Sequence, residues 1–92
     1  MDEITEDDRG VFIIKTERSI YIWENHEVRG EVRVIVTRYG KPMGYHDTVT
    51  GRQLHTTGVA IWPVLGQPFR YNLHGDVPWI ASPGPLSIER LI

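Results

Sequence analysis

Residues 31–38, with the sequence Glu-Val-Arg-Val-Ile-Val-Thr-Arg, alternate apolar and polar side chains almost without interruption. Successive side chains of a β-strand point to opposite faces, so Val32, Val34 and Val36 can enter a core while their neighbours meet water. Ile35 is the exception, because it places an apolar side chain on the wet face. The stretch therefore predicts an amphipathic strand that covers one side of a core.

Two β-branched and aromatic runs precede this strand, at residues 11–16 and 19–24. A polar linker of hairpin length joins them, so we expect the first hairpin here. The second run carries apolar side chains on both faces, with Ile20 and Ile22 on one and Tyr21 and Trp23 on the other. We expect this strand to be central in its sheet or part of an interface.

The composition extends the β prediction to the whole chain. Valine, isoleucine and threonine number 26, against nine for alanine, leucine and methionine together, and the first group favours pleated, half-buried surfaces. Nine glycines at short intervals suit short strands joined by turns. We predict an all-β fold, a small antiparallel sandwich or partly open barrel of about six or seven short strands with little or no helix.

The second half of the chain contains five of the six prolines. Because proline has no backbone N–H to donate to a neighbouring strand, we expect the strands there to be edge strands or to contain bulges. These strands are expected near residues 58–65, 69–73 and 77–81. In the middle of the chain, we expect residues 45–49 and 52–57 to pair as a hairpin that projects from the domain. The tail, residues 86–92, is too short to distinguish a strand from a helical turn.

The length of 92 residues allows one core. We expect an acidic, mobile segment at residues 1–8 and a single β domain at residues 9–92. No apolar run reaches the roughly 20 residues of a membrane span, and the acidic start is unlike a secretory signal, so we expect a cytoplasmic location and no membrane partner. The absence of cysteine excludes disulfides and thiolate metal sites.

Beyond residue 8 the chain has ten bases against seven acids, and the whole excess lies in residues 28–52. One alternative is therefore an OB-like or SH3-like domain that binds nucleic acid. Its phosphate-binding and base-stacking residues would be Arg29, Arg33, Arg38, Lys41 and Arg52, with Tyr39 and Tyr45. Against it, exposed arginines usually pair with carboxylates, and the isoelectric point is near 6.

A third class is a small metal-dependent or acid–base enzyme, because imidazole and carboxylate groups are abundant in the polar turns. The candidate groups are His46, Asp47, His55, His74 and Asp76. Their spacing matches no metal motif, and no serine sits in a nucleophile elbow. We predict no metal, no cofactor and no catalytic residue.

The aromatic residues favour binding to another protein. Tryptophan and tyrosine are enriched in binding hot spots, and two of the three tryptophans stand beside proline on expected edge strands, where a partner can attach. The expected partner-binding residues are Tyr21, Trp23, Trp62, Pro63 and Trp79.

The leading interpretation is thus a non-enzymatic protein–protein interaction module that also forms a homodimer. Small domains without motifs are common products of viral and mobile-element accessory genes, so docking to a host protein is one expected role.

Overall fold

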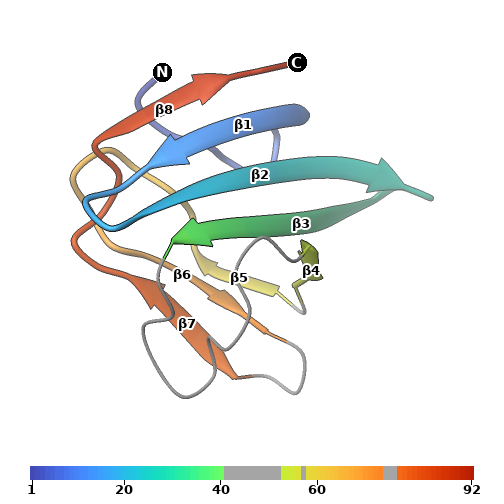
Figure 1. Cartoon of the computed structure of the whole chain (residues 1–92). Coiled ribbons are helices and arrows are strands. Elements are labelled where there is room, and N and C mark those ends of the chain that lie inside the picture. Colours follow the sequence, from blue (N-terminus) through green and yellow to red (C-terminus); the bar gives the residue numbers. More distant parts are fainter. Residues whose placement is uncertain (41–52, 57, 74–76) are drawn as a thin grey trace.

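The chain folds into two antiparallel β-sheets that face each other (Figure 1). The computed structural model describes residues 1–40, 53–56, 58–73 and 77–92, without the side chains of residues 53–55. The first sheet has the order β4-β3-β2-β1-β8. Its strands are β1 (Gly10–Lys15), β2 (Ser19–Val28), β3 (Glu31–Gly40), β4 (Gln53–His55) and β8 (Ser87–Arg90). The middle strand of this sheet is therefore β2.

The second sheet is a three-stranded meander in the order β5-β6-β7. Its strands are β5 (Gly58–Ile61), β6 (Phe69–Asn72) and β7 (Pro78–Ala81). After β7 the chain returns to the first sheet, where β8 pairs with β1. The predicted sandwich is confirmed and the partly open barrel is not formed.

Several local predictions are confirmed and others need correction. The hairpin of β1 and β2, the amphipathic strand β3 and the edge positions of β5 and β7 are present, with a bulge between Val59 and Ile61 in β5. The strand β6 is not an edge, because it pairs with β5 on one side and β7 on the other. The tail forms a strand, which brings the described strands to eight. Residues 45–49, the expected partner of 52–57, lie outside the described residues, and β4 pairs with β3.

A two-residue turn connects β2 to β3. Val28 lies opposite Glu31, and the residues between them, Arg29 and Gly30, have φ angles of 53° and 79°. Two positive φ values in succession suit the right-handed twist of a hairpin, and glycine accepts this conformation without steric cost. The turn fixes the register of the two longest strands, so the alternation seen in the sequence is carried across the sheet.

The core lies between the two sheets. Alternate residues of the first sheet enter it, and the aromatic residues of β6 meet them from the second sheet. The buried apolar set is Ile4, Phe12, Ile14, Tyr21, Trp23, Val34, Val36, Phe69, Tyr71, Ala81 and Ile88. In the described part of the chain there is no helix, and so none that could cross a membrane.

The acidic start of the chain packs on the sandwich. Ile4 is fully buried, and its backbone N–H donates to the carbonyl of Pro63 at 2.9 Å. The Asn25 side chain donates to the carbonyls of Thr5 and Asp8 at 3.1 and 2.9 Å. The core therefore begins at Ile4 and not at residue 9, because one isoleucine among the five carboxylates provides an apolar anchor. The mobility of residues 1–8 stays a prediction.

We expect Ile4→Ala to lower the free energy of unfolding by about 2–5 kcal/mol, as for other fully buried isoleucines. Urea denaturation followed by tryptophan fluorescence measures the change. The control is Asp7→Ala, an exposed neighbour, which should change stability by about 0.5 kcal/mol or less. Equal, small effects of the two variants would mean that the segment is not docked in solution.

Candidate protein-interaction surfaces

Three of the five aromatic and proline residues predicted to bind a partner are buried. Trp23 is fully inaccessible, Tyr21 is 2% exposed, and Pro63 is also fully buried. These residues cannot touch a partner while the sandwich is intact, so the prediction is wrong for them. Their apolar area is used within the chain.

Trp23 is buried because both its ring and its N–H group find partners. Its ring meets Phe69 and Tyr71 of the opposite sheet edge-on, with centroids 5.8 and 5.9 Å apart. Its Nε1–H donates to Oδ1 of the buried Asn25 at 2.8 Å. A tryptophan whose N–H is hydrogen-bonded inside the protein can be removed from water without leaving that group unpaired.

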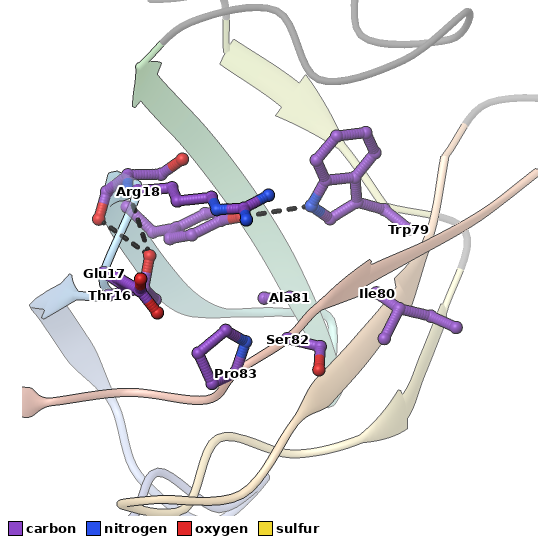
Figure 2. A pocket seen from close by; sticks show the side chains of 10 residues that line it. Thr16, Glu17, Arg18, Trp79, Ile80, Ala81, Ser82 and Pro83 are labelled. Atoms are coloured by element: carbon purple, nitrogen blue, oxygen red, sulfur yellow. Dashed lines mark hydrogen bonds between the residues drawn. The ribbon is translucent and has the colours of Figure 1, made fainter.

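The other two tryptophans are half-buried at the border of the core. Trp79 on β7 donates from Nε1 to the Tyr21 hydroxyl at 3.0 Å, and the guanidinium of Arg38 lies 5.2 Å from its ring centre. Figure 2 shows the Trp79 indole reaching from β7 toward the first sheet. Trp62 follows β5, with its ring centre 5.8 Å from that of Trp23. Each therefore retains partly exposed surface for another molecule.

A small hollow lies beside Trp79, between the β1–β2 turn and the end of β7 (Figure 2). Its volume is about 30 Å³, close to the share of one water molecule in the liquid, ~30 Å³. The residues that line it are Thr16, Glu17, Arg18, Ser19, Tyr21, Trp79, Ile80, Ala81, Ser82 and Pro83. This volume is too small for a substrate or cofactor.

A larger hollow opens beside Trp62, where β3 and β5 face each other. Its volume is about 240 Å³, and its apolar lining comes from Val32, Val34, Val59 and Trp62. Glu6 and Arg33 are its charged lining residues, and Thr56 and Gly58 complete it. It has the size of a side-chain pocket.

The outer face of the five-stranded sheet, turned away from the core, is also apolar. The residues on it alternate with the buried ones, so β1, β2 and β3 each present apolar side chains there. In the register Ile13 lies opposite Ile22, Ile22 opposite Thr37, and Ile20 opposite Tyr39. We call the set Val11, Ile13, Ile20, Ile22, Ile35 and Tyr39 the outer-face patch. Thr37 shares this face but is only 4% exposed. The second sheet covers only the opposite face.

The basic residues do not form one surface in the described part of the chain. Arg29 and Arg33 are exposed near the β2–β3 turn, and Arg33 pairs with Glu31 at 3.1 Å. Arg38 is 5% exposed and faces the core side against Trp79. Tyr39 lies on the opposite face, six positions along β3 from Arg33. Lys41, Tyr45 and Arg52 lie outside the described residues.

Most of the candidate metal-binding and acid–base groups lie outside the described residues. This holds for His46, Asp47, His74 and Asp76, and for the side chain of His55 in β4. Among the residues whose side chains are described, no group of three or more histidines and carboxylates could hold a metal ion. The remaining histidine, His26, forms an exposed pair with Glu24 at 3.3 Å. The prediction that no metal binds stays a prediction.

The residue predictions missed both the outer-face patch and the larger hollow, and the sequence contained a signal for the first of them. Ile35 stood out as an apolar residue on the wet side of its strand, and Ile20 with Ile22 gave the next strand a second apolar face. Together these three residues mark the outer-face patch. The hollow had no such signal, because it joins segments that are far apart in the sequence.

No family model, curated protein or solved structure matches this chain.

The division of the basic residues between two faces gives a test of the nucleic-acid alternative. We expect Arg33→Glu to change salt-dependent retention on an oligonucleotide column no more than Arg18→Glu, which alters an exposed arginine in the β1–β2 turn. A loss of retention confined to Arg33→Glu would support nucleic-acid binding and contradict this expectation.

Proposed function

We propose that this protein is a non-enzymatic protein–protein interaction module, and that its outer-face patch docks against a second copy of the chain. The observation that carries the proposal is the pair of neighbouring rows in which Ile13 lies opposite Ile22 and Ile20 lies opposite Tyr39, the last two being 40% and 50% exposed. Contiguous apolar surface on a small protein marks an interaction site more often than scattered apolar residues do.

The opposite outer face, on the three-stranded sheet, is less suited to docking. Its most exposed apolar residues are Ile61 and Ile80, but Arg70 lies between them in the register. A guanidinium in the middle of the row keeps water close to both isoleucines, since its charge is costly to bury. In the outer-face patch a carboxylate, Glu24, lies between Val11 and Ile35, but no charged residue lies between Ile13 and Ile22 or between Ile20 and Tyr39.

A second copy fits the patch for two reasons. Flat sheets of β-branched residues pack face to face, as the two sheets within this sandwich do, and a two-fold interface uses the same surface twice. The charged residues around the patch also have both signs, with Lys15 opposite Ile20, Glu24 opposite Val11, and Glu89 opposite Ile13. Such a border selects neither a strongly acidic nor a strongly basic partner.

In this proposal the dimer is the form of the protein that binds a further protein. A cytoplasmic location and an accessory role in a virus or mobile element belong to the same proposal, and they rest on the sequence interpretation. The half-buried Trp62 and Trp79 remain available for contacts with that protein, whereas the outer-face patch is used between the two copies.

We expect the wild-type chain to be a dimer in sedimentation velocity, and Ile22→Lys to raise its dissociation constant by about 100-fold or more, because two ammonium groups would be buried face to face. Ile20 is 40% exposed, so Ile20→Lys tests the same surface with less risk to folding. Thermal melting of each variant shows whether the fold is retained.

The matched control is Ile80→Lys, which adds the same charge at a residue 56% exposed on the other sheet. This variant should remain dimeric. A wild-type protein that is monomeric at the highest concentration reached, or an Ile80→Lys variant that dissociates as readily as Ile20→Lys, contradicts the proposed interface.

A further inference from the structure

The edge of β3 is only partly covered by β4. β3 runs over ten residues, but β4 pairs with it at Ile35, Val36 and Thr37 alone. The backbone N–H of Thr56 then donates to the carbonyl of Val34 at 3.2 Å, and by Gly58 the chain belongs to β5 in the other sheet. No described strand pairs with this edge of β3 between Glu31 and Arg33.

The uncovered edge has backbone groups directed outward at Val32. In an antiparallel pair, residues alternate between those that bond to the neighbour on one side and those that bond on the other. The Val34 carbonyl bonds on the β4 side, so the groups of Val32, two residues away, point to the same side. A strand end with such groups is a template for an added strand.

The larger hollow lies beside the same residues. Val32 and Val34 line it from β3, and Val59 and Trp62 line it from the second sheet. Residues directly opposite each other in a sheet share a face, so a residue added opposite Val32 would direct its side chain into this hollow. About 240 Å³ is several times the ~30 Å³ share of one water molecule, enough for a whole aliphatic or aromatic side chain.

We propose that an extended peptide segment of another protein adds to β3 as an antiparallel strand opposite Val32 and places one large apolar side chain in the hollow beside Trp62. The site lies at a sheet edge and between the sheets, so it is separate from the outer-face patch. It extends the proposed interaction module from self-association to the capture of a peptide, with backbone hydrogen bonds for affinity and the hollow for specificity.

The direction of the added strand also sets a charge preference. Continuing the course of β4, the peptide would run from Val34 toward Glu31 and end near the β2–β3 turn. Arg29 and Arg33 are exposed there, and with Val28 and Glu31 they line an open recess of about 400 Å³. An acidic residue three positions after the apolar one, which points to the same face of the sheet as Arg33, therefore matches this end of the site.

Synthetic peptides test the proposal. The probe is a five-residue peptide of threonines with leucine at the second position, opposite Val32 and clear of Thr56, and aspartate at the fifth position, compared with peptides that carry glycine at the second position or lysine at the fifth. Binding is followed by amide chemical shifts and hydrogen exchange of the ¹⁵N-labelled protein. We expect shifts at Val32, Val34 and Val59, slower exchange of the Val32 N–H, and weaker binding of both comparison peptides.

Two protein variants separate strand addition from binding elsewhere. Val32→Pro removes the outward N–H but leaves the groups of Glu31 and Arg33 that pair with β2, and proline is tolerated at strand edges. It should weaken the leucine peptide about tenfold, as expected for a lost hydrogen bond and a blocked edge. The matched control, Val32→Thr, keeps the N–H and should bind within about threefold of wild type. Val59→Lys, which places a charge in the hollow from the other sheet, is the second variant should Val32→Pro not fold.

The proposal is overturned if the glycine peptide binds as well as the leucine peptide, if the shifts lie away from β3 and β5, or if Val32→Pro and Val59→Lys bind like wild type. The variant Ile20→Lys should still bind the peptide as a monomer. Failure of the dimer and failure of the peptide site are therefore measured independently.

Discussion

The packing of Trp23 against Phe69 and Tyr71 holds the two sheets together, and the other features depend on it. The indole comes from the middle strand of the larger sheet and reaches the central strand of the smaller one, so it ties both sheets at their centres. Its N–H is bonded to Asn25, whose amide in turn holds the carbonyls of Thr5 and Asp8. One side-chain network thus connects the core to the acidic start of the chain.

The two faces of β2 have different surroundings in this arrangement. Its odd-numbered residues from Ser19 to Asn25 face the second sheet, and the even-numbered isoleucines face the other way. Because the side-chain period of a strand is two, the four consecutive apolar residues from Ile20 to Trp23 place apolar side chains on both faces of the sheet. The described second sheet packs on one face, and the outer-face patch lies on the other.

The aromatic residues show how the number of apolar side chains can mislead an interpretation of function. Trp23, Tyr21 and Pro63 looked like surplus apolar area, but two facing sheets accommodate more large rings than a single layer. Of the five residues predicted to bind a partner, Trp62 and Trp79 keep exposed surface, at the border of the core. The arginines were divided in a similar way, since Arg33 and Arg38 have opposite parity in β3 and therefore point to opposite faces. Among the described residues of the basic stretch, Arg33 and Arg38 therefore do not share a surface.

Local periodicity was enough to predict the all-β class, the first hairpin, the faces of β3 and the two-sided character of β2, because these depend on side chains a few residues apart. The burial of Ile4, the central position of β6 and the meeting of β3 with Trp62 depend on how the two sheets pack. That packing brings together residues about thirty positions apart in the sequence, as with Val32 and Trp62, and no pattern within one strand contains it. Sequence alone therefore determined which faces are apolar, and tertiary structure decided which of those faces are covered, because coverage depends on contacts between distant segments.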